Sequence, residues 1–291
     1  MKFLIIGGSG FLGSHVADYL TELGHQVLIY DKIESKYIKK KQKFFKGDIK
    51  NISNNQSIFK GLDYVFNFAG IADIGQSKQK PTETILENIL PVVKILELCS
   101  KYKVKKFIFA STIYVYSNQG FYYKCSKLSA ELYIREFCKI NKLKYVILRY
   151  GSLYGPRSNS LNGIYNLLEK IIKNKKINFI GRSDSKREYI HVKDAARASV
   201  DLIQNKFDNQ SIIVTGEISY KLSDLIQIVS EIIGKKVKAN FSNKLNSETG
   251  HYHYTPYNLI EYESKKYTLP FHVDIGQGLI DTIKDIRKNN K

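Results

Sequence analysis

Residues 2–31 read KFLIIGGSGFLGSHVADYLTELGHQVLIYD, and this stretch decides the fold class. An apolar run ends in glycines, apolar residues then recur at helical spacing up to Gly24, and a second apolar run follows at 26–31. The stretch therefore predicts a strand, a helix that ends at Gly24, and a second strand. Gly7, Gly10 and Gly13 lie between the first strand and the helix, where the chain must turn tightly.

The spacing of these three glycines, G-x-x-G-x-x-G, is typical of a dinucleotide-binding turn. It lets backbone N–H groups and the N-terminus of the helix approach a pyrophosphate. Phe11 and Leu12 fall inside the motif and are predicted cofactor contacts as well. Asp31 ends the next strand, where its carboxylate can bind the adenosine ribose hydroxyls and repel a 2′-phosphate. The motif therefore predicts NAD rather than NADP. The neighbouring Lys32 is a further predicted cofactor contact and weakens that preference a little.

Two more strands are predicted to end at the same edge of the sheet, at 43–48 and 63–70. Asp48 either contacts the adenine or caps a turn after Gly47. The small residues at the end of NFAG (67–70) would let the backbone approach a cofactor, although they also suit a simple strand end. The predicted cofactor contacts in these segments are Asp48, Ile49, Phe68, Ala69 and Gly70.

Strands and helices continue to alternate along the chain. The predicted elements are a long helix at 81–102 that Pro91 should kink, a strand at 105–112, a helix at 121–140, a strand at 144–151, helices at 162–174, 192–204, 222–234 and 274–287, and a strand at 211–216. The alternation predicts an α/β fold: a Rossmann-type doubly wound parallel sheet with a smaller C-terminal α/β domain. We expect an NAD-binding domain at 1–155, with a segment near 190–216 that returns to it, and a mainly substrate-binding domain at 156–291.

Composition narrows the class of protein. The 291 residues are 43% hydrophobic and 25% charged, which is ordinary for a globular chain. No apolar run approaches the roughly 20 residues of a membrane span, and the apolar start breaks at glycine too early for a signal peptide. Three cysteines without metal-like spacing favour the cytoplasm and no metal site. The net charge of +19 comes from lysines spread along the chain, so we expect an anionic small substrate rather than nucleic acid.

A Tyr-x-x-x-Lys pair marks the predicted catalytic centre. Five such pairs occur, but only Tyr123 and Lys127 lie on a predicted helix that follows a strand ending in Ser111-Thr112. Residues four apart share a helix face, so the ammonium should lower the tyrosine pKa from about 10. A hydroxyl at the strand end can hold a substrate oxygen while the tyrosine moves a proton. Beside a nicotinamide, this set suits hydride transfer at a carbinol or ketone.

Together the motifs resemble the extended short-chain dehydrogenase/reductase family, in particular its NAD-dependent epimerase/dehydratase branch, which acts on nucleotide sugars. The resemblance covers roughly residues 1–200 and continues more weakly to about 285. The matching segments, in the family's order, are GGSGFLG (7–13), GDI (47–49), VFNFAG (65–70), FIFASTIYVYS (107–117), YYKCSK (122–127), LRYGSLYGP (148–156) and REYIHVKDAARA (187–198). NFAGIADIGQSKQKP (67–81) is especially similar to UDP-galactose 4-epimerases.

The resemblance implies roles for single residues. Thr112 matches the catalytic Ser/Thr, with Ser111 as the second choice and a substrate contact. Tyr123 matches the acid/base. Lys127 matches its partner, which also holds the nicotinamide ribose. Asn88 matches an asparagine in the helix behind the cofactor site.

On the substrate side, Arg187 matches an arginine that binds a nucleotide diphosphate, although an ion pair with Glu188 would also explain it. Ser152 stands where many epimerases have an asparagine that contacts the sugar nucleotide, so the sugar stays open. The segment HYHYTPY (251–257) either lines the substrate site or is an ordinary aromatic loop.

The most specific function implied is a nucleotide-sugar epimerase that oxidises the sugar transiently at C4, with Tyr123 as acid/base. Dehydration is disfavoured because Ile113 and Tyr114 replace the acidic pair of family dehydratases. A 4-ketoreductase or dehydrogenase using NAD(P)H is the alternative, and a non-catalytic NAD-binding regulator is a third. The helices at 81–102 and 121–140 match those that form family dimers, so a homodimer is expected.

Overall fold

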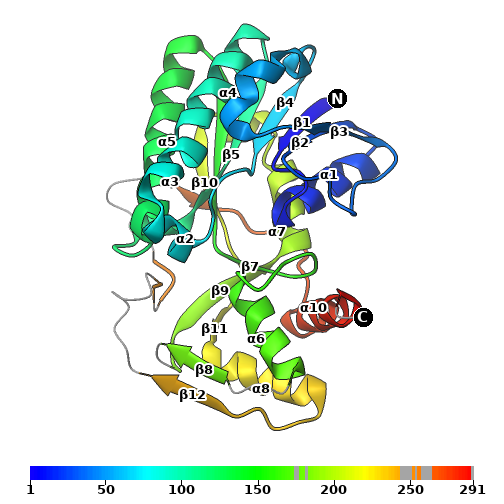
Figure 1. Ribbon diagram of the computed structural model, residues 1–291, viewed down its shortest axis with the longest axis vertical. Coiled ribbons are helices and arrows are strands. Elements are labelled where there is room, and N and C mark those ends of the chain that lie inside the picture. The colour runs from blue at the N-terminus through cyan, green and yellow to red at the C-terminus, as the bar shows by residue number, and fades with distance from the viewer. Residues whose placement is uncertain (174–176, 181–182, 243–250, 253, 257–263, 290–291) are drawn as a thin grey trace.

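The computed structural model describes residues 1–173, 177–180, 183–242, 251–252, 254–256 and 264–289. In these ranges, one eight-stranded parallel sheet has the order β13-β10-β6-β5-β4-β1-β2-β3 (Figure 1). Its strands are β1 (Lys2–Ile6), β2 (Gln26–Asp31), β3 (Gln42–Lys46), β4 (Tyr64–Asn67), β5 (Lys106–Thr112), β6 (Lys144–Tyr150), β10 (Gln210–Val214) and β13 (Lys265–Lys266). The strand order reverses between β1 and β4, where ligands of such sheets bind. The predicted doubly wound fold is confirmed.

Helices cover both faces of this sheet (Figure 1). One face packs against α1 (Phe11–Glu22) and α7 (Val192–Asp201), and the other against η1 (Ile49–Phe59), α4 (Leu90–Lys101) and α5 (Phe121–Asn141). Because both faces are covered, the strands are apolar on both sides. None of the helices in the described ranges has the length and apolarity to cross a membrane.

The segment predicted as one long helix at 81–102 forms two helices, α3 (Pro81–Asn88) and α4, with α2 (Ile74–Gln79) before them. The break falls at Ile89, just before Pro91. Proline has no N–H to donate back along the helix and its ring crowds the preceding turn, so the kink appears on its N-terminal side. The break leaves Asn88 at the end of α3, facing the end of β4.

The remaining elements form a second lobe. It contains a three-stranded sheet of β7 (Ser152–Tyr154), β9 (Lys186–His191) and β11 (Ser219–Lys221), and a pair of strands, β8 (Ile177–Ile180) and β12 (Ala239–Ser242). The helices α6 (Gly163–Ile172), α8 (Leu222–Ile233) and α10 (Ile275–Asn289) pack around a core of their own. Between β9 and β11, α7 and β10 return to the large sheet. The domain boundary at residue 155 stays a prediction.

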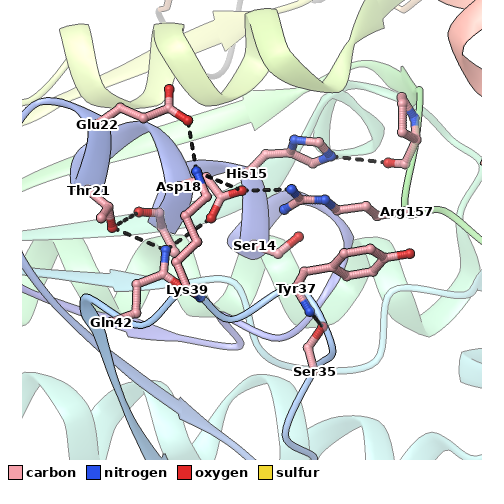
Figure 2. Close-up of polar contacts among 12 residues, drawn as sticks. Ser14, His15, Asp18, Thr21, Glu22, Ser35, Tyr37, Lys39, Gln42 and Arg157 are labelled. Atoms are coloured by element: carbon pink, nitrogen blue, oxygen red, sulfur yellow. Dashed lines mark hydrogen bonds and ion pairs between the residues drawn. The ribbon is translucent and has the colours of Figure 1, made fainter.

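A polar cluster joins the two lobes on the outer side of α1 (Figure 2). Arg157, just after β7, donates to the Asp18 carboxylate, and its backbone N–H donates to Asp285 of α10. His15 contacts the carbonyl of Pro156 through Nε2 at 3.1 Å. The helix that starts at the glycine turn is therefore tied directly to the second lobe.

Candidate active site

The glycine turn after β1 has no room for side chains. Gly7 has φ +79°, and a Cβ there would lie 2.6 Å from the backbone nitrogen of Ala69. A Cβ on Gly13 would lie 2.3 Å from the Gly7 carbonyl oxygen. The Gly7 N–H donates to the backbone carbonyl of Tyr30 at 2.9 Å. This bond holds β1 and β2 together where the chain turns. Phe11, Leu12 and Gly13 form the first turn of α1, directly after the N-cap Gly10.

A cavity of about 260 Å³ opens beside this turn. Its lining includes eight of the predicted cofactor residues: Gly7, Gly10, Asp31, Lys32, Ile49, Phe68, Ala69 and Gly70. Asp31 accepts hydrogen bonds from the backbone N–H groups of Ser9, at 3.1 Å, and Ile33, at 3.3 Å. The carboxylate therefore shapes the glycine turn as well as facing the cavity.

At the rim of the cavity, Asp48 caps η1 by accepting from the Lys50 N–H at 2.8 Å. Lys32 lies 3.0 Å from Glu87 and 3.5 Å from Asp48. Both carboxylates neutralise a lysine that would otherwise favour a 2′-phosphate. The capping role of Asp48 is present, and contact with adenine stays a prediction.

Asn88 is almost completely buried, and its side-chain amide forms three hydrogen bonds. Its Oδ1 accepts from the Ile71 N–H at 2.7 Å, and its Nδ2 donates to the Ile71 carbonyl and to Ser126 Oγ, both at 2.9 Å. Asn88 thus ties the segment after β4 to α5. Direct contact of its side chain with a cofactor stays a prediction.

The predicted catalytic residues meet at the C-terminal end of β5. Thr112 ends this strand, and its side chain lies close to the phenol of Tyr123, which is in the first turn of α5. The Tyr123 N–H donates to Ser77 Oγ at 3.1 Å, so α2 orients the start of α5. One turn further on, Lys127 donates from Nζ to the Ala110 carbonyl at 2.9 Å.

The pKa values of Tyr123 and Lys127 differ from those expected from the sequence. Burial raises the pKa of Tyr123 to about 12, while the nearby Thr112 side chain has a smaller, lowering effect on it. Burial also lowers the pKa of Lys127 to about 8, against an opposite effect of the Glu131 carboxylate. The expected lowering of the Tyr123 pKa is therefore wrong for the ligand-free protein. Helical spacing places the two residues on one face, but desolvation of the phenol has the larger effect.

Ser111 points away from this centre. Its hydroxyl donates to Glu131 Oε1 at 2.5 Å, and only 3% of the residue is exposed. The role of Ser111 as a substrate contact stays a prediction. Its hydroxyl is already hydrogen-bonded to Glu131. Glu131 was not foreseen, although it follows Lys127 by four residues, as Lys127 follows Tyr123.

An aromatic wall flanks Tyr123 on the side of the second lobe. The Tyr114 ring lies 6.2 Å from the Tyr123 ring and 4.8 Å from that of Tyr252. The Tyr114 hydroxyl contacts His251 Nδ1 at 2.8 Å. Ser152 Oγ lies 3.2 Å from the Tyr252 hydroxyl. His251 and Tyr252, from the 251–257 segment, thus belong to the aromatic wall next to the predicted catalytic tyrosine, and 253 and 257 lie outside the described residues.

Arg187 extends from β9 towards the same wall. Its guanidinium lies 5.2 Å from the centre of the Tyr252 ring, and within the described part of the chain it forms no ion pair. Glu188 instead accepts from Lys266 at 2.9 Å and from Thr215 at 2.6 Å. The alternative explanation of Arg187, an ion pair with Glu188, is therefore wrong.

Comparisons with known proteins agree with this arrangement. A family model described as "NAD dependent epimerase/dehydratase family" matches residues 3–216. A putative UDP-glucose 4-epimerase of Methanocaldococcus jannaschii is 26% identical over 99% of each chain, and the human UDP-glucose 4-epimerase is 25% identical over 81% of this chain and 83% of its own.

Two solved structures have the same fold. The Thermotoga maritima UDP-glucose 4-epimerase, crystallised with UDP-glucose, superposes with a TM-score of 0.86 at 26% identity, over all of both chains. The Bacillus cereus UDP-glucuronic acid 4-epimerase, in complex with UDP-glucuronic acid and NAD, has a TM-score of 0.86 at 23% identity over 99% of this chain and 100% of its own. The family match covers most of the chain, and it confirms the predicted enzyme class and the predicted cofactor, NAD. The chain belongs to the NAD-dependent epimerase/dehydratase family.

Proposed function

We propose that this protein is a nucleotide-sugar 4-epimerase. The observation that carries the proposal is that Thr112, Tyr123 and Lys127 meet at the end of β5, the strand next to β4, after which Phe68, Ala69 and Gly70 line the cavity. Relatives named as UDP-glucose and UDP-glucuronate 4-epimerases match most of the chain and support it.

The cavity residues fit NAD. The glycine turn has space only for backbone, as the approach of a Gly13 Cβ to the Gly7 oxygen shows. Such a turn at a helix N-terminus is suited to a pyrophosphate, and Asp31 on the cavity wall is suited to ribose hydroxyls. When bound, NAD would supply a reversible hydride acceptor for the sugar C4.

The side chains at the end of β5 would handle the proton. Thr112 would hold the sugar 4-oxygen, and Tyr123 would take the proton of the 4-hydroxyl and later return it. The Lys127 ammonium, on the same helix face, would stabilise the phenolate and bind the nicotinamide ribose. For epimerisation the keto sugar must turn within the pocket before the proton is returned.

Arg187 is the proposed partner of the substrate diphosphate. It is a cation without a described carboxylate partner, and it lies at the same aromatic wall as Tyr252. A guanidinium binds phosphate oxygens through two parallel hydrogen bonds. The Ser152 and Tyr252 hydroxyls beside it are proposed contacts to the sugar nucleotide.

A 4-ketoreductase is the second candidate, and one observation favours it. Burial raises the pKa of Tyr123, which favours the protonated phenol that can donate to a keto sugar over the phenolate. A reductase needs Tyr123 only to donate a proton, whereas an epimerase also needs Tyr123 as a phenolate that accepts one.

The two candidates are separated by incubating purified protein with UDP-, dTDP-, GDP- and CDP-sugars without added cofactor, and analysing the sugars by chromatography. Epimerisation by as-purified protein, or with catalytic NAD, supports the proposal. Turnover that consumes NAD(P)H stoichiometrically identifies a reductase. Tyr123→Phe is the negative control for both.

Exposed apolar side chains support a homodimer built on α3, α4 and α5. They are Ile85, Leu86, Leu90, Tyr122, Leu132, Tyr133 and Ile140. All three cysteines are free thiols, which agrees with the cytoplasmic location that we propose.

A further inference from the structure

A buried ion pair lies directly behind the proposed active site. Glu131 of α5 accepts from Arg149 of β6 through two hydrogen bonds, NH2 to Oε2 at 2.6 Å and Nε to Oε1 at 3.0 Å. The two side chains are 1% and 0% exposed. The same carboxylate accepts from Ser111 Oγ, and Arg135 of α5 lies 3.5 Å away.

Stability alone is a weak reason for such a pair. Removing two charges from water is costly, and apolar residues of similar volume often serve a core equally well or better. The positions that the pair connects are more informative.

Through Glu131, the pair connects α5 and β5, which carry the catalytic residues, to the neighbouring strand β6. Ser111 and Arg149 are direct neighbours in the β5–β6 register, one position before Thr112. Glu131 binds both of them from α5, at i+8 from Tyr123 and i+4 from Lys127. The carboxylate therefore sets how α5 sits on the end of β5, where Tyr123 meets Thr112.

The Glu131 charge also acts on Lys127. Burial lowers the pKa of Lys127 to about 8, and Glu131 is the one described charged group that opposes this effect. From β5, Lys127 meets the Ala110 carbonyl and the Phe109 ring, neither of which titrates. The Glu131 carboxylate therefore favours the ammonium form of Lys127.

We propose that Glu131, held by Arg149, is a positioning residue: it fixes α5 on the ends of β5 and β6 and keeps Lys127 in its ammonium form. The inference deepens the proposed function and rests on it, because Lys127 matters for catalysis only if Tyr123 exchanges protons with a substrate. The effect on Lys127 itself can be measured without any substrate.

The experiment titrates Lys127 by NMR in ligand-free protein that carries carbon-13-labelled lysine. The signal missing from Lys127→Met identifies the residue. We expect a midpoint near 8 in the unmodified protein. In Glu131→Gln the midpoint should fall by about half a pH unit or more, as loss of a nearby opposite charge requires.

Lys106→Met is the matched control. Lys106 is buried at the other end of β5, 3% exposed, and forms an ion pair with Asp208 at 2.5 Å. Its removal should destabilise the protein but leave the Lys127 midpoint unchanged. If Glu131→Gln does not fold, the double variant Glu131→Met/Arg149→Met removes both charges and should shift the midpoint in the same direction.

An unchanged midpoint in a folded Glu131 variant overturns the proposal, whatever the activity. Assays on the nucleotide sugars that the unmodified protein turns over then test the positioning: kcat should fall at least tenfold with little change in KM, and the alkaline limb of the kcat profile should move to lower pH. A shifted midpoint in a protein that converts no nucleotide sugar would instead refute the proposed function and leave the effect on Lys127 established.

Discussion

Arg157 donates to Asp18 across 2.7 Å, and this contact links the helix that begins at the glycine turn to the second lobe (Figure 2). The same carboxylate accepts from Gln42 at 3.0 Å and pairs with Lys39 at 3.5 Å. Asp18 is therefore the centre of a cluster that gathers α1, β3 and the residue after Pro156. It lies on the outer side of α1, away from the proposed catalytic centre.

We predict that Asp18→Ala destabilises the protein by about 1–3 kcal/mol, because it leaves buried donors without an acceptor. Glu22→Ala is the control on the same helix: Glu22 is 63% exposed and pairs with Lys39, so its loss should cost less than about 0.5 kcal/mol. Urea unfolding of the two variants measures the difference. Equal effects would show that the cluster adds nothing beyond a surface ion pair.

Local sequence patterns predicted the fold and many residues of the glycine-lined cavity, and for a physical reason. The glycine spacing, the apolar strands and the position of Asp31 all express constraints between residues close in the chain. In doubly wound sheets the crossover between parallel strands is right-handed, and this rule nearly determines the order of β1, β2 and β4. Pro91 likewise predicted the break between α3 and α4.

Contacts between distant segments were not predictable in this way. The pair of Glu131 with Arg149 depends on the register of β5 and β6. Tyr252 reaches Ser152 from a hundred residues further along the chain. The pKa of Tyr123 depends on how completely the surrounding elements exclude water, which a Tyr-x-x-x-Lys spacing cannot express.

Gly13→Ala should abolish NAD binding or raise its Kd at least tenfold. The added Cβ would lie 2.3 Å from a backbone oxygen of the glycine turn, which cannot move without opening the turn. Gly163→Ala, at the start of α6, meets nothing within 4 Å and should bind NAD normally. Calorimetric titration of NAD into both variants tests this. Normal NAD affinity in Gly13→Ala would show that the turn is not the pyrophosphate site.

Tyr123→Phe should lower kcat by about 10²–10⁴-fold, the usual contribution of a general acid/base, while NAD affinity changes little. Tyr122→Phe is the adjacent control; Tyr122 is 48% exposed and should keep full activity. Sugar conversion is followed by chromatography of the reaction mixture. Should the two variants be equally active, another residue moves the proton.

The proposed dimer predicts that charge on α5 separates the subunits. Tyr133→Glu places a carboxylate at a position that is 56% exposed in the single chain and would be buried between subunits. Phe271→Glu, at a position 78% exposed outside these helices, serves as control. Light scattering after size exclusion should give a monomer for the first variant and a dimer for the second. If the Tyr133→Glu variant is still a dimer, the interface does not include this part of α5.

Stability should fall as the solution becomes mildly acidic, because two histidines are buried in neutral form. Burial lowers the pKa of both His15 and His191 to about 4, and these residues are only 8% and 1% exposed. In the unfolded chain each histidine takes up its proton near pH 6.5, so between pH 6.5 and 4 the unfolded state binds more protons than the native state. The contribution of the two neutral histidines to the free energy of unfolding is therefore intact above pH 6.5. It is lost progressively down to pH 4, by at most about 3 kcal/mol per histidine. Urea unfolding at pH 7.5, 6 and 5 measures the slope, and His191→Gln should make it shallower. A slope that this variant does not change would show that the pKa of His191 is not lowered in the native protein.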